Sequence, residues 1–157
     1  MTKFKILSWI LKLFILFHIL AFVMSAYTIY LLSGVTEVDV KKVIFSTLLY
    51  MPLGVLFAIG LYYIHQSCIM FLKRGYFNLK SSLYLKRGGY ILGASALLSI
   101  CSSVINHGNL TDLKAIQNFS ENITYNILWL VVSFALIATT DILKKGVNLK
   151  RENDLTI

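Results

Sequence analysis

The chain has 157 residues, of which 57% are hydrophobic and 14% are charged, whereas about 25% of the residues in a typical soluble domain are charged. A soluble domain of this length could not bury so much apolar surface, and its apolar residues form long blocks, which are typical of membrane proteins. The net charge of +8 does not require a nucleic-acid partner, because the basic residues gather between the apolar blocks, as topology signals do.

Four apolar blocks follow one another along the chain, and a membrane-spanning helix needs roughly 20 apolar residues. The first block, from about Leu13 to Leu32, carries no charged residue. The second and fourth blocks have full length, and the third is short unless Gly88 and Gly89 extend it. A signal peptide is the alternative for the first block, but its apolar run exceeds the roughly 7–15 residues of a signal core. We therefore expect membrane-spanning helices at about 6–32, 43–72, 88–105 and 123–145.

The basic residues predict how these helices cross the membrane. Of the 15 Lys and Arg residues, twelve lie before the first block, between the second and third, or after the fourth. Segments rich in Lys and Arg stay in the cytoplasm, so we expect both termini and the middle connection on that side. The sequence thus predicts an all-α membrane protein with one integral domain over residues 1–157. Its four-transmembrane-helix bundle would consist of two antiparallel hairpins, with residues 146–157 as a cytoplasmic tail.

Two of the expected helices contain residues that affect helix geometry. Pro52 and Gly54 lie inside the second helix and predict a bend or local unwinding, either as an ordinary packed kink or as part of a transport site. The third helix is rich in small residues, and Gly89 and Gly93 form a Gly-x-x-x-Gly pair. Small residues let helix backbones approach closely in lipid. We therefore expect the third helix at the centre of the bundle, with both glycines packing within the chain rather than in a homodimer.

The residues that could carry chemistry are few. His18, His65 and His107 lie at three different depths of the expected topology, so they do not converge on a metal. His18 is a functional candidate because it is ionisable and lies inside the membrane; a hydrogen bond to a serine of the third helix is the plainer interpretation. No catalytic triad, metal-protease motif or phosphate-binding glycine loop is present in the sequence. We expect no enzyme activity, no cofactor and no metal.

One short sequence occurs twice. Leu-Lys-basic-Gly, with Asn-Leu-Lys close behind it, stands at residues 72–80 and again at 143–150. Basic side chains favour the negative end of the helix dipole, and Gly readily takes the left-handed conformation that ends a helix. We therefore expect Gly75 and Gly146 to end the second and fourth helices. A true duplication of a helix pair and convergence on the same helix stop both explain the repeat.

The residues after the second copy carry a resemblance to a known family. The C-terminal stretch "LKKGVNLKRENDLTI" resembles the end of the bacterial domain-of-unknown-function 2975 family of small four-helix membrane proteins. In that family, a basic-Gly step precedes Leu-x-x-Glu-Asn-Asp-Leu-Thr-Ile/Val. The matching positions here are Gly146, Leu149, Glu152, Asn153, Asp154, Leu155, Thr156 and Ile157. The last six of these form the part of the tail in which we expect partner binding.

The middle connection is also similar to the family. Its pattern of basic-Gly-x-Phe and then Leu-basic-basic-x-Gly is matched by Gly75, Phe77, Leu85, Lys86, Arg87 and Gly89. The chain departs from the family in the segment after Phe77, where many members have an acid-asparagine pair and this chain reads "NLKSS". A partner contact made by that particular segment is therefore not implied by the resemblance.

The resemblance implies a location and a class of partner but no reaction. Members of the family are often found beside a small cytoplasmic helix-turn-helix regulator. We therefore expect a noncatalytic multi-pass protein of the bacterial inner membrane, surrounded by the lipid bilayer. Its cytoplasmic face would bind or sequester such a DNA-binding regulator, without contacting nucleic acid itself. The alternative is a small-solute transporter, channel or toxin-immunity protein, with a polar path lined by His18, Pro52 and the serines of the third helix.

Overall fold

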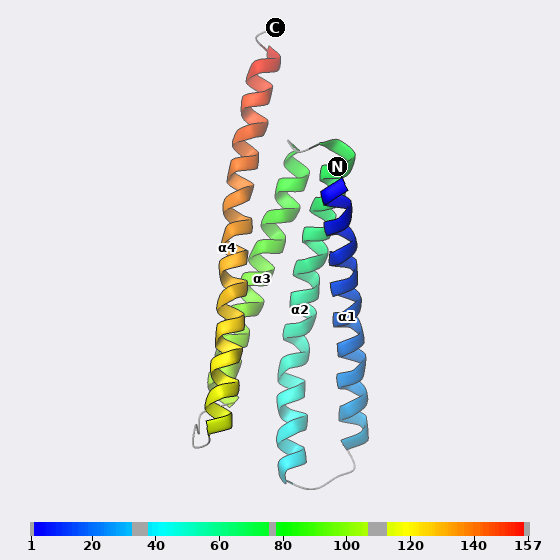
Figure 1. Cartoon of the computed structure of the whole chain (residues 1–157), viewed down its shortest axis with the longest axis vertical. Coiled ribbons are helices and arrows are strands. Elements are labelled where there is room, and N and C mark those ends of the chain that lie inside the picture. Colours follow the sequence, from blue (N-terminus) through cyan, green and yellow to red (C-terminus); the bar gives the residue numbers. More distant parts are fainter. Residues whose placement is uncertain (1, 33–37, 76–77, 107–112, 156–157) are drawn as a thin grey trace.

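The computed structural model describes the whole chain except residues 1, 33–37, 76–77, 107–112 and 156–157. The described residues fold into four α-helices and contain no strand, so the expected all-helical fold is confirmed. Each helix is long and apolar enough to cross a membrane, by its length and composition. In chain order the helices are α1 (Thr2–Leu32), α2 (Val38–Arg74), α3 (Leu79–Asn106) and α4 (Leu113–Leu155) (Figure 1).

Successive helices run in opposite directions and lie side by side in chain order (Figure 1). Within the described residues the backbone of α1 approaches only α2, and the backbone of α4 approaches only α3. The packing between α2 and α3 is at least as extensive as that of the other two neighbouring pairs. The N-terminus, the α2–α3 connection and the C-terminus all lie at one end of the molecule (Figure 1). This end is called the basic end below, because most of the Lys and Arg residues precede or follow these points in the sequence.

The third helix is the most buried of the four, as expected from its small residues, and it packs between α2 and α4. A Cβ atom added to Gly88 would lie 2.8 Å from Cγ1 of Ile64 in α2. On the other side, a Cβ atom at Gly89 would lie 2.9 Å from Cγ1 of Ile137, and one at Gly93 would lie 2.5 Å from Oγ of Ser133 in α4. Real Cβ atoms do not approach this closely, so these glycines let the three backbones pack tightly. The Gly-x-x-x-Gly pair therefore lies against α4 of the same chain.

Buried serines link the same three helices through hydrogen bonds. Ser67 of α2 donates its hydroxyl proton to the carbonyl oxygen of Ser81 at 2.9 Å, and Ser82 donates to the carbonyl oxygen of Thr140 in α4 at 3.2 Å. Ser133 of α4 donates to the carbonyl oxygen of Gly89 at 2.7 Å. Such bonds satisfy polar groups that would otherwise be costly to bury in an apolar environment. They also fix the register of α3 against its two neighbours.

Pro52 does not interrupt α2. The helix continues from Val38 to Arg74 with Pro52 inside it, so the expected local unwinding is wrong. Proline removes one backbone donor, but a single missing bond does not end a helix of 37 residues that packs along much of its length.

The two copies of the repeated sequence fold differently. Gly75 has φ of +79°, the only positive φ among the described residues, and its N–H donates to the carbonyl oxygen of Phe71 at 3.1 Å. This is the left-handed helix stop that the sequence predicts. Gly146, by contrast, lies inside α4, which continues to Leu155. The predicted helix stop at Gly146 is therefore wrong, and the tail expected from residue 146 is helical as far as Leu155.

The physical reason lies in the residues on the C-terminal side of each glycine. After Gly75 the chain starts a new helix, and Asn78 caps it: the Oδ1 atom of Asn78 accepts a hydrogen bond from the N–H of Lys80 at 2.9 Å. After Gly146, by contrast, α4 continues to Leu155. Leu143 packs against the buried core and Val147, one turn later, is only 7% exposed. Side-chain packing therefore carries α4 through the glycine.

The same cap explains why α3 is longer than the sequence predicts. The expected helix begins at residue 88, whereas α3 begins at Leu79. The prediction relied on the apolar block alone, and the residues from 79 to 87 include three basic side chains and several polar ones. Helix formation does not require apolar residues, and the backbone hydrogen bonds are the same outside the membrane as inside it. The basic residues expected in a loop are therefore helical.

Candidate functional site

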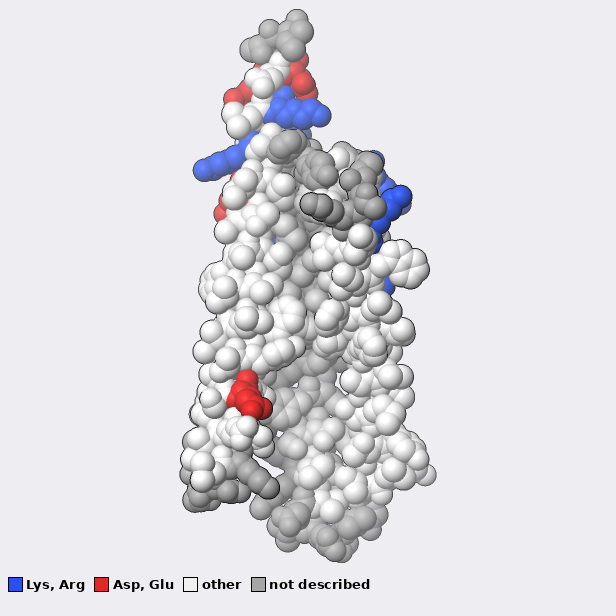
Figure 2. Space-filling model, in the orientation of Figure 1, with Lys and Arg blue, Asp and Glu red and all other residues white. Residues whose placement is uncertain are grey.

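The C-terminal part of α4 extends beyond the other helices at the basic end (Figure 1). We call residues 148–155 the α4 arm, and every one of them is exposed. Leu149 is 61% exposed and Leu155 is 86% exposed. In Figure 2 positive and negative side chains gather on this projecting segment, above a largely uncharged surface. The arm combines the basic pair Lys150 and Arg151 with the acidic residues Glu152 and Asp154.

The length of α4 explains why the arm projects. The helix has 43 residues, and at roughly 1.5 Å per residue it is about 64 Å long. The hydrocarbon core of a bilayer is only about 30 Å thick. By the same rise, α3 with its 28 residues is about 42 Å long. A large part of α4 must therefore lie outside any bilayer that α3 spans.

The six tail residues predicted to bind a partner divide into two groups. Glu152, Asn153, Asp154 and Leu155 belong to the α4 arm and are exposed. Thr156 and Ile157 lie outside the described residues. These first four residues are helical. An exposed helix docking into a groove of a partner is the mode that fits this geometry.

The residues of the predicted middle-loop signature do not lie together in a loop. Gly75 ends α2, and Phe77 lies outside the described residues. The other three belong to α3, where Leu85 is 6% exposed and part of the core. Lys86 places its ammonium group 5.6 Å from the centre of the Tyr90 ring, and Arg87 is exposed. The signature is therefore a helix stop, one core residue and two basic side chains near the basic end.

His18 lies on α1 and faces α2. Its Nδ1 donates to the carbonyl oxygen of Phe14 at 2.8 Å, and its ring stacks on Phe57 of α2 with a centroid distance of 4.9 Å. The predicted hydrogen bond to a serine of α3 is therefore wrong. The carbonyl oxygen one turn earlier in α1 already accepts from this ring. A carbonyl oxygen only accepts, so Nδ1 is the donor in this bond.

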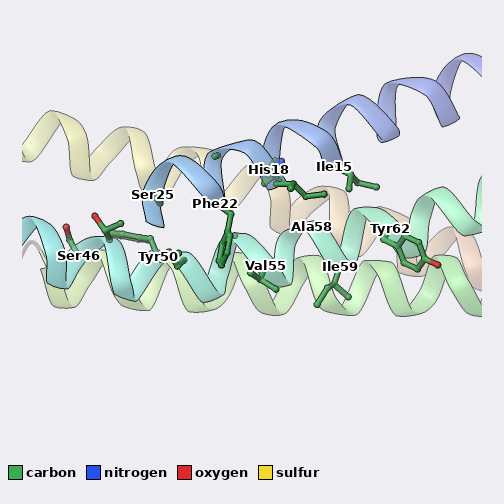
Figure 3. A pocket seen from close by; sticks show the side chains of 15 residues that line it. Ile15, His18, Phe22, Ser25, Ser46, Tyr50, Val55, Ala58, Ile59 and Tyr62 are labelled. Carbon is green, nitrogen blue, oxygen red and sulfur yellow. The ribbon is translucent and has the colours of Figure 1, made fainter. Parts of the chain in front are cut away.

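A cavity of about 600 Å³ lies between α1 and α2 beside His18. We call it the α1–α2 cavity. Figure 3 shows Phe22 pointing from α1 toward α2, between Tyr50 and Val55 in this view. Most of its lining is aliphatic or aromatic, and no Asp, Glu, Lys or Arg is among the lining residues. Pro52, which only the alternative transport function placed along a polar path, lines neither this cavity nor the smaller one and is exposed on α2.

A second, smaller cavity of about 170 Å³ adjoins it. We call it the α2–α4 cavity, and His18, Tyr50 and Gly54 line both cavities. The smaller cavity also contains Ser99 of α3 and Trp129 of α4. The Nε1 atom of Trp129 is buried, and it has no hydrogen-bond partner among the described residues. Sequence reasoning did not identify Trp129 as a site residue, because a tryptophan in a membrane-spanning helix usually lies at the boundary between membrane and water.

A polar chain connects three helices next to the α2–α4 cavity. The Tyr50 hydroxyl lies 3.5 Å from Oγ of Ser103, and Ser103 donates to Oδ1 of Asn122 at 2.8 Å. Nδ2 of Asn126 also donates to that oxygen, at 2.7 Å. The sequence signal for this polar chain is a pair of asparagines four residues apart, Asn122 and Asn126, and this spacing places both on one helix face.

The remaining histidines do not join His18. His65 is 7% exposed at the basic end, and its Nε2 atom lies 3.0 Å from Oγ of Ser8 in α1. His107 lies outside the described residues. Within the described part of the chain, no group of three His, Cys, Asp or Glu side chains is placed to hold a metal ion.

The fold and composition define an all-helical protein with four segments suited to crossing a membrane. Comparison with known protein families identifies the family within this class. The chain belongs to the family described as "Protein of unknown function (DUF2975)", whose model matches residues 3–157. The resemblance seen in the tail and the middle connection is thus confirmed over essentially the whole chain. No curated protein and no solved structure matches the chain.

Proposed function

We propose that this protein is a noncatalytic multi-pass protein of the bacterial inner membrane, and that its α4 arm binds a soluble cytoplasmic protein. The observation that carries the proposal is the arm itself: residues 148–155 form a fully exposed helix that extends beyond the rest of the bundle. A projecting helix with exposed leucines and charges of both signs suits docking into a groove on another protein. The small helix-turn-helix regulator implied by the family resemblance is the partner we propose.

The proposal requires the basic end to face the cytoplasm. The N-terminus, the α2–α3 connection and the C-terminus lie at this end, and most of the basic residues of the chain flank these points. The positive-inside rule then favours two antiparallel hairpins with both termini in the cytoplasm. In this orientation the arm is presented to soluble proteins and not to the cell exterior.

Binding to the arm would control the regulator by determining where in the cell it is held. A regulator held on the arm is confined to the membrane surface, and its contact face is covered by the helix. Lys150, Arg151, Glu152 and Asp154 give the arm charges of both signs. Complementary charges on a partner would set the orientation of docking and would speed association, while the exposed leucines would supply most of the apolar contact.

The test compares the full chain with a chain that ends after Val147. Both are purified in detergent from cells and used to capture cytoplasmic proteins, which are identified by mass spectrometry. We expect the full chain to capture a helix-turn-helix protein and the shortened chain to lose it. The proposal is contradicted if the full chain captures no DNA-binding protein, or if the shortened chain captures the same one.

A matched pair of variants separates the arm from the rest of α4. Leu149→Ala removes an apolar side chain that is 61% exposed on the arm, and Ile142→Ala removes one that is 70% exposed two turns earlier. Only Leu149 belongs to the arm. We expect Leu149→Ala to weaken capture of the regulator and Ile142→Ala to leave it unchanged. Equal effects of the two variants would indicate that general damage to α4, rather than loss of a docking surface, explains the result.

The cavities favour a second candidate function, transport or conduction of a small solute, or immunity to a toxin. His18 and Ser99 line the α2–α4 cavity together with the polar chain beside it. Under this alternative, His18→Leu and Ser99→Val should alter uptake or toxin resistance at unchanged protein level. Activity that survives both substitutions would exclude a path through this cavity.

A further inference from the structure

Two lysines near the basic end lie at the depth of the lipid headgroups. Leu32, the last residue of α1, is 20 residues after Lys12, which corresponds to about 30 Å along a helix. In α3, Asn106 likewise ends the helix 20 residues after Lys86. The hydrocarbon core of a bilayer is about 30 Å thick. When the far ends of α1 and α3 lie at one surface of this core, Lys12 and Lys86 lie at the other.

The charge of Lys12 has no acidic partner on the neighbouring helices. α1 and α3 contain no Asp or Glu, and Asp39, the only acidic residue of α2, lies at the opposite end of that helix. Within the described residues, the backbone of α4 does not approach α1. The Lys12 ammonium lies 5.2 Å from the centre of the Trp9 ring, and Trp9 is 67% exposed. A cation and an aromatic ring at this depth are available to a lipid headgroup.

The α1–α2 cavity continues from Lys12 into the membrane. Ile15, one helical turn after Lys12, lines one end of the cavity, and Tyr62 of α2 lies at the same end (Figure 3). The α1 lining extends to Ser25, so the cavity is about 15 Å long by the helical rise. This is half the thickness of the hydrocarbon core, the depth that the acyl chains of one leaflet fill. No charged residue lines the cavity.

We propose that this site binds an anionic phospholipid, with its phosphate at Lys12 and one acyl chain in the α1–α2 cavity. Phosphatidylglycerol represents this chemistry. The unbalanced cation selects the headgroup, because basic residues at the membrane surface attract anionic lipids, whereas a zwitterionic lipid carries a cation of its own. The proposal depends neither on what the α4 arm binds nor on which side of the membrane the basic end faces.

Lys86 provides a matched control for Lys12. It lies at the same depth, and its ammonium also lies beside an aromatic ring, 5.6 Å from the centre of Tyr90. No residue of α3 lines the α1–α2 cavity, however. Removing either charge weakens the attraction of the protein for an anionic membrane surface by a similar amount. Only the removal of Lys12 should affect a lipid whose chain lies in the cavity.

Quenching by brominated lipids measures binding in the cavity. The chain has two tryptophans; Trp9→Phe keeps an aromatic ring beside Lys12, Trp129→Phe removes the second indole, and Phe22→Trp places the sole fluorophore in the cavity lining. In lipid nanodiscs, we expect phosphatidylglycerol with brominated acyl chains to bind at least about fivefold more tightly than phosphatidylcholine with the same chains. This ratio corresponds to roughly 1 kcal/mol, the attraction of one lysine for an anionic lipid surface.

Four further substitutions in this reporter chain complete the test. Lys12→Gln should remove the preference for phosphatidylglycerol, whereas Lys12→Arg and Lys86→Gln should retain it. Gly54→Leu should also remove it, because Gly54 lines the cavity and an added Cβ atom there meets nothing within 4 Å.

Circular dichroism and gel filtration select the variants that fold. Equal binding of the two brominated lipids to the reporter chain would overturn the proposal. So would a preference that survives Lys12→Gln or a folded Gly54→Leu variant, or one that Lys86→Gln removes as well.

Discussion

Residues 72–80 and 143–150 share the order Leu-Lys-basic-Gly and then Asn-Leu-Lys, yet they have different structures. In the first copy, Gly75 ends α2 and Asn78 begins α3 within a few residues. In the second, the glycine and asparagine both lie inside α4. The same residue types therefore act as a helix stop and a helix start in one place, and as ordinary helical positions in the other.

The difference shows that the glycine permits a helix stop without imposing one. A left-handed glycine is favourable when the chain must turn and a cap is available for the next helix. Where packing continues, as for Val147 at 7% exposure, the helix passes through glycine at a cost of up to about 1 kcal/mol. The second copy consequently ends in an exposed helical arm, on which the proposed function depends.

The largest expected contrast comes from replacing the leucine of the Asn-Leu-Lys sequence by proline in each of the two copies. Leu79 is the first residue of α3, where the ring fits the first helical turn and no helical donor is lost. Leu149 lies inside α4, where proline costs about 3 kcal/mol. We expect Leu149→Pro to abolish amide-exchange protection in the α4 arm and Leu79→Pro to leave α3 protected. Loss of protection in α3, or retention in the arm, would contradict the assigned helix boundaries.

A smaller contrast of opposite sign is expected from alanine at the two glycines. Gly75 has φ of +79°, and nothing lies within 4 Å of an added Cβ atom, so Gly75→Ala should destabilise by about 1–2 kcal/mol through backbone strain alone. Gly146→Ala should stabilise α4 by up to about 1 kcal/mol. Unfolding titrations in mixed micelles measure the change in the free energy of unfolding for both variants. A loss of stability in both variants would show that Gly146 also adopts a strained conformation.

The smallest contrast is expected at the two asparagines. Asn78 accepts the N–H of Lys80 at 2.9 Å as the cap of α3, and replacing such a cap by alanine costs about 1 kcal/mol. Asn148 is an exposed residue inside α4, where alanine should gain a few tenths of a kcal/mol, up to about 0.7. The same titrations apply. If Asn148→Ala were as destabilising as Asn78→Ala, a capping role for Asn148 would replace the continuous helix.

The sequence predicted the helices better than their ends, for a physical reason. The small residues of the third segment, among them Gly89 and Gly93, indicated its close packing within the bundle. Apolar blocks reveal which residues lie in hydrocarbon, and these indicated the number of helices and the fold class. They do not reveal helical turns outside hydrocarbon. The beginning of α3 at Leu79 and the extension of α4 to Leu155 were missed for that reason.

The candidate site was less predictable, because it depends on register between helices. His18 was singled out from its depth in the membrane, but its actual partner is the carbonyl of Phe14 in its own helix. The unpaired N–H of Trp129 and the open space beside Gly54 arise only when α1, α2 and α4 are placed together. No periodicity or motif in a single helix carries that information.

The central claim, that the α4 arm is a protein-binding surface in the cytoplasm, can be tested directly by photo-crosslinking in intact cells. A benzoylphenylalanine is placed at Leu155, which is 86% exposed on the arm, and in a control chain at Leu31, which is 57% exposed and lies next to the last residue of α1. We predict that Leu155 crosslinks to a cytoplasmic helix-turn-helix protein, that Leu31 does not, and that Leu149→Pro removes the adduct. Crosslinking of Leu155 to lipid or periplasmic proteins only, or the same adduct from both positions, would contradict the claim.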